Sequence, residues 1–301
     1  MNRDLALLKL QAAPGIGPRT LYDLLTRLGE ENCDLVEFVQ LPREELVNNY
    51  ALGEYAADYL AADDDLLEQT YLQLQFREIG VMALGDAAYP QKLQRALERA
   101  APPLLFVWGN RELLKRPLVA ICGAREASAV STTTAHQSAT QLAQSQIVVL
   151  SGNAKGIDTA AHGGALSGGG ATIVVTPLGI LNFQYRTEYG SLADEHNTLV
   201  ISEFPPRLTW QAHNAMIRNR TIAALCDAMI VFEAGLTGGT LEAGKTALAQ
   251  GKPLFVADFV TESDTAPGNR KLVGGGGQLL SFDPDGTPDL EPILAVLAEQ
   301  A

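Results

Sequence analysis

IVVLSGNAKGIDTAAHGGAL, residues 147–166, passes from an apolar β-branched run through small and polar residues into a segment that contains several alanines. This order predicts a buried strand, a tight turn and a helix that begins near Ile157. The turn has three interpretations. It binds a phosphate of a nucleotide or nucleic acid, it places Asp158 and His162 on a metal, or it only connects two elements.

The same alternation continues on both sides of this stretch. Short apolar runs are separated by segments of helical length, which predicts βαβ units and a parallel α/β sheet. The runs are residues 118–122, 147–150, 172–176, 199–202, 228–232 and 253–257. Each run is followed by small or polar residues, and ligands of open parallel sheets bind beyond the carboxyl ends of the strands. We therefore predict the functional site at that edge of the sheet.

Residues 1–75 differ from the rest because their apolar residues recur at helical spacing. We predict a small all-helical domain over 1–75, an α/β domain over 76–285, and a tail over 286–301 with one short helix. PGIGPRT, residues 14–20, is similar to a helix-hairpin-helix turn, in which Gly15 and Gly17 would let backbone N–H groups approach a DNA phosphate. A packed turn between two helices explains these residues equally well.

Composition narrows the class of protein. The chain is 47% hydrophobic, and none of its apolar runs approaches the ~20 residues that cross a bilayer. The N-terminus lacks a signal-peptide pattern, and the three cysteines are widely spaced, so we expect a cytoplasmic protein without disulfides or zinc. A net charge of −13 argues against a broadly basic DNA-binding surface. A few arginines, backbone amides and helix N-termini still bind phosphate locally.

Four segments at the predicted edge have phosphate-binding features. Glycine-containing turns follow three of the apolar runs, and RNR occupies residues 218–220. The first turn is not GxGxxG and the second is not a Walker A loop. The predicted phosphate or DNA contacts are Gly123, Arg125, Ser151, Gly152, Lys155, Gly156, Arg218, Arg220, Gly238, Gly239 and Thr240, with Gly15, Gly17, Arg186, Glu242 and Lys245 as secondary candidates. We expect Arg125 and Arg218 to face solvent, so that replacing either costs little stability.

Metal and catalytic chemistry have less support in the sequence. Asp158 and His162 lie four residues apart on one helix face, but a third metal ligand is not apparent. We expect Asp158 to bind the helix start and His162 to hydrogen-bond into the turn. Ser151 has no identified base, so we do not expect it to act as a nucleophile. We predict no metal, no cofactor and no catalytic residue.

Six motifs occur in an order that resembles the DNA-processing protein A family, DprA/Smf. They are GAREAS, SGNAKGIDTAAHGGAL, ISEFPP, HN…RNRTIA, GGTLEA and PGNRKLVGGGG. The resemblance implies an extended Rossmann-like sheet with helices on both faces, preceded by a sterile-alpha-motif-like helical domain. It implies a homodimer that binds single-stranded DNA without catalysis, protects incoming DNA, and loads a RecA-type recombinase during natural transformation.

The resemblance also assigns roles to individual cations. Arg125 matches the arginine of the family's GSR-like turn, and Lys155 replaces an arginine of the SGxARGID turn. Arg218 and Arg220 match the family's paired arginines. Each of these side chains would neutralise a backbone phosphate, while stacked bases would add affinity that tolerates any sequence.

The sequence departs from the family at several positions. Asn153 stands where leucine is usual, residues 185–187 lack a proline, and we expect no C-terminal winged helix of the kind found in many members. GGTLEAGK replaces an SGSLITAR-like sequence and brings Glu242 to the pocket region. Its GTLE turn is similar to that of cytokinin-activating phosphoribohydrolases, in which a like glutamate assists catalysis. The alternative functions are therefore an N-glycoside-cleaving enzyme related to them, or a nucleotide-binding module without turnover.

Overall fold

The computed structural model describes residues 1–257, 266–283 and 286–300. By its internal contacts the chain divides into two compact units. Unit 1 comprises Met1–Trp108, Leu178–Asn182 and Ser202–Thr209, and unit 2 comprises Gly109–Pro177, Phe183–Ile201 and Trp210–Ala301.

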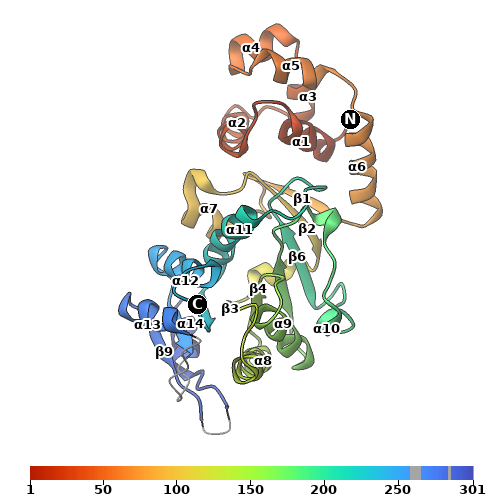
Figure 1. Cartoon of the computed structure of the whole chain (residues 1–301). Helices are drawn as coiled ribbons and strands as arrows, with labels where there is room; N and C mark the ends of the chain where they lie inside the picture. Colours follow the sequence, from red (N-terminus) through yellow and green to blue (C-terminus); the bar gives the residue numbers. More distant parts are fainter. Residues whose placement is uncertain (258–265, 284–285, 301) are drawn as a thin grey trace. The chain divides into compact units, whose positions relative to one another are not determined.

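Unit 1 begins with short helices joined by tight turns (Figure 1). They are α1 (Arg3–Ala12), α2 (Pro18–Glu30), α3 (Leu35–Val39), α4 (Arg43–Tyr50), α5 (Glu54–Ala61) and α6 (Asp65–Phe76). In α2, leucines at i, i+3, i+4 and i+7 from Leu21 are buried, which is the stripe expected of an amphipathic helix. Asp34 and Asp64 cap α3 and α6 by accepting N–H groups of the first turn.

The remainder of unit 1 contains a pair of strands. Its elements are β1 (Gly80–Ala83), α7 (Gln91–Leu97), η1 (Glu98–Ala100), β2 (Leu104–Gly109) and η3 (Ile180–Asn182). β1 and β2 are antiparallel, and both are largely buried. The sequence pattern predicted no strand in this segment.

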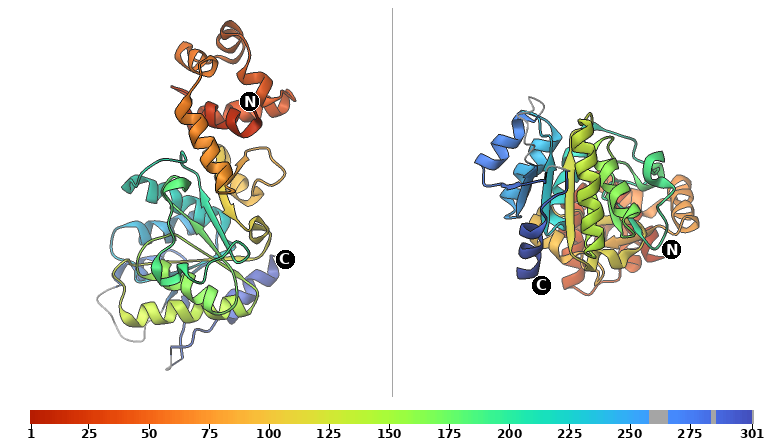
Figure 2. Two further views of the ribbon diagram at one scale, coloured as in Figure 1. Left: turned by 90° about the vertical axis from the view of Figure 1, so that its right-hand side faces the viewer. Right: turned by 90° about the horizontal axis from the view of Figure 1, so that it is seen from below.

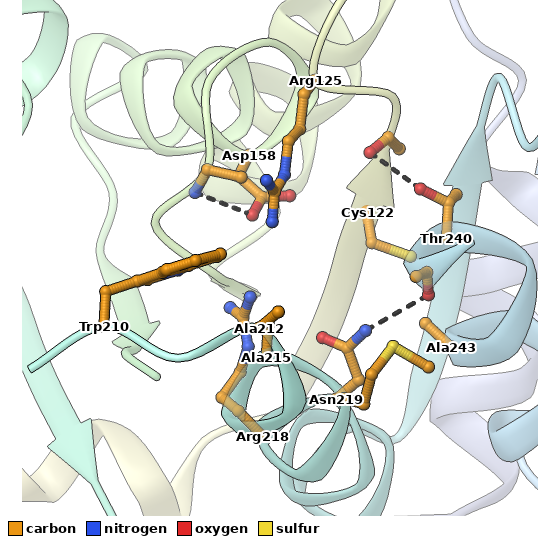
Figure 3. Close-up of a pocket in the computed structure, with 14 residues that line it drawn as sticks. Cys122, Arg125, Asp158, Trp210, Ala212, Ala215, Arg218, Asn219, Thr240 and Ala243 are labelled. Carbon is orange, nitrogen blue, oxygen red and sulfur yellow. Dashed lines mark hydrogen bonds between the residues drawn. The ribbon is translucent and has the colours of Figure 1, made fainter. Parts of the chain in front are cut away.

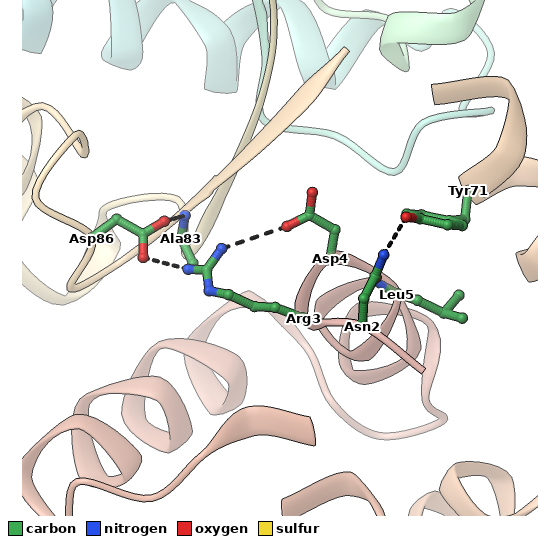
Figure 4. A network of polar contacts seen from close by, with 7 residues as sticks. All are labelled: Asn2, Arg3, Asp4, Leu5, Tyr71, Ala83 and Asp86. Carbon is green, nitrogen blue, oxygen red and sulfur yellow. Dashed lines mark hydrogen bonds and ion pairs between the residues drawn. The ribbon is translucent and has the colours of Figure 1, made fainter. Parts of the chain in front are cut away.

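Polar contacts connect α1 to other parts of unit 1 (Figure 4). Asn2 caps α1 through its side-chain oxygen and donates through Nδ2 to the Tyr71 hydroxyl of α6. Arg3 donates to Asp86, whose other carboxylate oxygen accepts the Ala83 N–H at 2.7 Å. The helices and the β1–β2 pair therefore form one contact group, whereas the sequence suggested a boundary after residue 75. Independent folding of residues 1–75 stays a prediction.

Unit 2 is built on a parallel sheet with the strand order β6-β5-β4-β3-β7-β8-β9. The strands are β3 (Leu118–Gly123), β4 (Val148–Ser151), β5 (Thr172–Val175), β6 (Thr198–Ser202), β7 (Ala228–Phe232), β8 (Leu254–Ala257) and β9 (Gln278–Leu280). All residues of β4 to β8 are buried, as expected when both faces of a parallel sheet are covered. The predictions of strands in the six apolar runs are confirmed.

Helices cover both faces of this sheet (Figure 2). On one face, α8 (Ala129–Gln144), α9 (Ile157–Ser167) and α14 (Glu291–Glu299) enclose a core that includes Val119, Ile121 and Ile230. The other face is covered by α11 (Ala212–Leu225) and α12 (Gly239–Ala249), with α13 (Pro267–Gly274) packed against α12. The shorter segments are η2 (Arg111–Lys115) and α10 (Thr187–Gly190). The predicted Rossmann-like architecture is confirmed.

The order of the strands identifies one special position. β3 pairs with β4 on one side and with β7 on the other, so the chain reverses its direction across the sheet at β3. In open α/β sheets such a switch point leaves a crevice beyond the carboxyl ends of the adjoining strands. The turns after β3, β4 and β7 meet there.

Candidate functional site

A pocket of about 300 Å³ lies at the switch point and is formed only by residues of unit 2. Residues after β3 and β4, the N-terminal half of α11 and the first turn of α12 line it. In Figure 3 the side chains of Arg125, Arg218 and Trp210 point toward the same open space from three segments. The sheet topology thus brings together segments that are far apart in the sequence.

Arg218 occupies the floor of this pocket. It is 6% exposed, and its Nη1 donates to the carbonyl of Val175 at 2.9 Å. Asp158, also 6% exposed, accepts the N–H of Ala154 at 3.1 Å. Burial raises the pKa of Asp158, and the positive charge of Arg218 opposes this rise. Our expectation that Arg218 faces solvent is therefore wrong, because its guanidinium lies beside a buried carboxylate.

Gly152 explains how the two charges come so close to the turn after β4. A Cβ atom at this position would overlap the Arg218 guanidinium and would lie 2.5 Å from Asp158 Oδ2. Gly156 has a φ of 76°, and a Cβ there would overlap the carbonyl of Ala124. These glycines are therefore required by packing, whatever the pocket binds.

Ser151 and His162 stabilise the turn after β4 through buried hydrogen bonds. Ser151 is fully buried, and its hydroxyl donates to the Ile121 carbonyl at 2.6 Å, which links β4 to β3. We therefore correct its place among the binding residues, because Ser151 is fully buried and its hydroxyl bonds to the backbone of β3. His162 is also fully buried, with Nε2 2.6 Å from the Gly152 carbonyl and Nδ1 2.7 Å from the Thr172 hydroxyl. Burial lowers the pKa of His162 to about 4, so a neutral imidazole holds the turn as we expected.

Three of the predicted cations are exposed. Arg125 lines the pocket, and Lys155 lies in the turn before α9. Arg220 is exposed on α11 two residues after Arg218, outside the pocket lining. Arg186 has a different position, because its Nε donates to the Asn153 carbonyl at 2.9 Å and it is half-buried. Arg186 thus supports the turn that carries Lys155.

The third predicted cradle is the N-terminus of α12. Gly238 has a φ of 106° and precedes the helix without a side-chain cap, and Gly238 and Gly239 are both exposed. Gly239 and Thr240 line the pocket. The Thr240 hydroxyl donates to the carbonyl of Gly123 at 2.9 Å, which joins this turn to the end of β3. The first backbone N–H groups of α12 therefore lie beside the pocket, where they favour an anion.

Glu242 and Lys245 do not line the pocket. They form an ion pair on α12, with Lys245 Nζ 2.8 Å from Glu242 Oε1, and the Glu242 side chain is 46% exposed. The sequence predicted Glu242 near the pocket because it follows the glycines directly. Two residues along a helix rotate a side chain by about 200°, so Glu242 points to a different face of α12 from Thr240.

Gly15 and Gly17 lie in unit 1, in the turn between α1 and α2. Gly15 has a φ of 83°, and Gly17 is the N-cap of α2 without a side-chain hydrogen bond. A Cβ atom at either position would meet no atom within 4 Å. The turn is thus open around both glycines, and a role in DNA binding stays a prediction.

Several residues of the pocket were not predicted from the sequence. Trp210 is 54% exposed and Met216 is 41% exposed, and both line it together with Asn219. Asn219 donates to the Gly239 carbonyl at 3.2 Å, which ties α11 to α12. Trp210 precedes the RNR segment by fewer than ten residues, so an exposed aromatic beside a cationic motif was the available signal.

Over residues 1–257, 266–283 and 286–300, the structure contains no group of three or more His, Cys, Asp or Glu side chains placed to hold a metal ion. Within the same described ranges, no helix combines the length and apolar character that crossing a bilayer requires.

The fold and the pocket define a Rossmann-like protein with a cationic and aromatic site at its switch point. Residues 80–285 match the family described as DNA recombination-mediator protein A. The chain therefore belongs to this family, in agreement with the order of its sequence motifs.

Relatives from several bacteria support this assignment. The chain is 32% identical to DNA processing protein DprA of Streptococcus pneumoniae over 228 residues, which cover 75% of this chain and 79% of that protein. It is 28% identical to DprA of Bacillus subtilis over 230 residues, or 73% and 76% of the two chains. A DprA relative in Mycobacterium tuberculosis is 32% identical over 54% of this chain and 42% of its own length.

Two solved structures have the same fold. The X-ray structure of DprA from Streptococcus pneumoniae has a TM-score of 0.77 at 28% identity, covering 93% of this chain and 95% of its own. DNA processing protein A from Helicobacter pylori has a TM-score of 0.61 at 26% identity, covering 74% and 97%. The Helicobacter pylori structure was described for its single-stranded DNA binding mode.

Proposed function

We propose that this chain binds single-stranded DNA at the pocket at the switch point and does so without catalysis. The observation that carries the proposal is the presence of an exposed guanidinium, Arg125, and an exposed indole, Trp210, on one pocket (Figure 3). A single strand offers phosphates for the cation and unpaired bases for the aromatic face. A duplex offers the same phosphates but keeps its bases stacked, so the indole has nothing to bind.

The surrounding cations suggest how the backbone of the strand is bound. Lys155 and Arg220 are exposed on the elements that flank the pocket, and we propose that they contact neighbouring phosphates. The N-terminus of α12 adds backbone N–H groups at Gly239 and Thr240. Because the whole chain carries a net charge of −13, attraction to DNA is restricted to this locally cationic edge.

Arg218 contributes to binding mainly through its position. Its guanidinium is buried beside Asp158 and the Val175 carbonyl. The Asp158 carboxylate therefore partly neutralises its positive charge inside the protein. We propose that it holds the floor of the pocket and presents one edge to the ligand. The residues proposed for phosphate contact are therefore Arg125, Lys155 and Arg220 first, and Arg218 second.

Family membership supports a wider role. The matched family is described as a recombination mediator, and a relative of known structure is described as binding single-stranded DNA. We propose that this chain protects incoming DNA and delivers it to a RecA-type recombinase during natural transformation, acting in the cytoplasm as a homodimer. The hydrolase alternative has no support from the pocket, because Glu242 pairs with Lys245 and does not line it.

A polarisation titration with a labelled single-stranded oligonucleotide and its duplex tests the proposal. We expect tighter binding of the single strand, and weaker binding after Arg125→Ala. Arg111→Ala is the matched control, because Arg111 is exposed in η2, which precedes the amino end of β3 and is remote from the pocket edge. Equal losses from both substitutions, or a preference for the duplex, would contradict the proposal.

A further inference from the structure

Glu233 is a buried acid at the carboxyl end of β7 that lies outside the pocket lining. It is 3% exposed, and its φ of 47° lies in the left-handed region that residues other than glycine rarely adopt. Gly123 and Phe232 are register partners in β3 and β7, so Ala124 and Glu233 begin two neighbouring turns. Glu233 can therefore reach the helix that follows β3.

Both carboxylate oxygens of Glu233 accept hydrogen bonds from the N-terminus of α8. Oε1 lies 2.7 Å from the Ser131 hydroxyl, and Oε2 lies 3.0 Å from the backbone N of Ser128. Ser128 is the N-cap of α8, and its hydroxyl oxygen accepts the Ser131 N–H at 3.1 Å. In a capping box, the acid that accepts the N-cap N–H comes from the third helical residue. Here Ser131 occupies that position, and the carboxylate comes from another strand.

The backbone around Glu233 is held from its other side by α13. The Asn269 side-chain oxygen accepts the Ala234 N–H at 2.8 Å, and the Gly268 N–H donates to the Ala234 carbonyl at 2.8 Å. Asn269 also donates to Ala257 at the end of β8. The PGNRK segment thus maintains the left-handed turn that directs Glu233 toward α8. Its position is fixed by contacts on both sides.

We propose that Glu233 is a built-in anion that fills the phosphate position at the N-terminus of α8. In dinucleotide-binding Rossmann folds, a pyrophosphate sits at the N-terminus of the helix after the first strand of the sheet. In this chain the Glu233 carboxylate already accepts hydrogen bonds at the start of α8. A second negative charge at this position would be repelled. Glu233 therefore excludes dinucleotides and nucleoside diphosphates from α8.

The same contacts position the turn between β3 and α8. This turn, residues 124–127, carries Arg125 and ends at Ser128. The backbone N–H of Ser128 donates a hydrogen bond to the Glu233 carboxylate. Phosphate recognition on this side of the pocket then depends on the Arg125 side chain and not on the helix backbone. This second part rests on the proposed binding of single-stranded DNA, whereas the exclusion of phosphate from α8 does not.

Two variants separate the charge of Glu233 from its volume. Glu233→Gly removes the carboxylate and suits the left-handed backbone, so we expect it to fold. Inorganic phosphate or acetate can then occupy the vacated position and raise the Tm by several degrees relative to chloride at the same ionic strength. Glu233→Gln fills the position with an uncharged amide, so we expect its Tm to respond like that of the parent protein. An equal response of the glycine variant and the parent would overturn the proposal.

Binding of single-stranded DNA tests the positioning role. We expect Glu233→Gly to weaken binding by no more than Arg125→Ala, and acetate to restore part of the loss. The double variant should bind no more weakly than Arg125→Ala alone, because Glu233 acts through Arg125. Losses that multiply in the double variant would overturn the positioning role. A parent protein that binds no single strand would instead contradict the proposed function, and the phosphate experiment would still decide the role of Glu233.

Discussion

Replacing Arg218 with alanine tests how the floor of the pocket is stabilised. Arg218 and Asp158 are each 6% exposed, and Arg218 also donates to the Val175 carbonyl at 2.9 Å. Alanine removes this hydrogen bond and leaves the Asp158 carboxylate without its buried positive neighbour. Loss of one partner of a buried charge pair costs about 3–5 kcal/mol. For a unit of this size, we expect the Tm to fall by on the order of 10 °C.

The stability lost in Arg218→Ala should depend on pH in a defined direction. Burial raises the pKa of Asp158 above its ordinary value of 3.8, and Arg218 limits this rise. Because its pKa is raised, the Asp158 carboxyl binds a proton more tightly in the folded state than in the unfolded state. Protonated Asp158 therefore favours folding below the ordinary pKa, and this contribution is lost as the pH rises through the folded-state pKa. Removing Arg218 enlarges this loss. The difference in Tm between parent and Arg218→Ala should therefore narrow as pH falls from neutral toward 3.8.

Thermal unfolding of four proteins completes the test: the parent, Arg218→Ala, Asp158→Asn and the double variant. We expect Arg218→Ala to cost much less in the Asp158→Asn background, because the carboxylate that it leaves buried is then uncharged. Arg125→Ala is the control, since Arg125 is exposed and its loss should change stability by about 0.5 kcal/mol or less. A Tm of Arg218→Ala close to that of the parent, or equal costs in both backgrounds, would show that the buried pair does not stabilise the pocket.

Three further predictions concern binding. Affinity for single-stranded DNA should fall with salt at a log–log slope of about −2, because the exposed cations Arg125, Lys155 and Arg220 each contribute ~−0.7; a flat response would exclude phosphate contact. Trp210→Ala should weaken single-strand binding by about 1–3 kcal/mol in a polarisation titration while Trp210→Phe retains most of it, and equal affinities would argue against stacking. Glu242→Gln should leave affinity unchanged or slightly higher, and neither protein should release base from a nucleoside monophosphate; turnover lost on substitution would favour the hydrolase.

Much of the fold follows from short-range features of the sequence. The six apolar runs predicted as strands form β3 to β8, because β-branched runs bounded by turn residues have few alternatives in a covered parallel sheet. The hydrogen bond of His162 to the turn was also predictable, since its partner Gly152 lies only ten residues away. β1, β2 and β9 were missed. β9 is a three-residue strand with two exposed residues, so its sequence carries little periodic signal.

The pocket edge could be located from sequence because parallel strands end on the same side of their sheet. The sequence also named Arg125, Gly239 and Thr240, which line the pocket, since turn glycines and cations mark such an edge. The sequence could not show which of the predicted residues are exposed and which are buried. Serine and arginine are common in exposed phosphate-binding sites, yet Ser151 and Arg218 are both buried. Ser151 bonds to the Ile121 carbonyl of β3, and Arg218 bonds to the Val175 carbonyl of β5.

The sequence by itself determined the six strands β3 to β8, their connection as parallel βαβ units and the edge of the sheet where the candidate pocket lies, because these depend on local periodicity and on general rules of chain connection. Only the tertiary structure decided which of the predicted charges are exposed and which are buried. Arg218 meets the Val175 carbonyl across 43 residues of sequence, and Glu233 meets the Ser128 N–H across 105. Burial, and with it the cost of a charge, is set by such distant contacts, which no local pattern records.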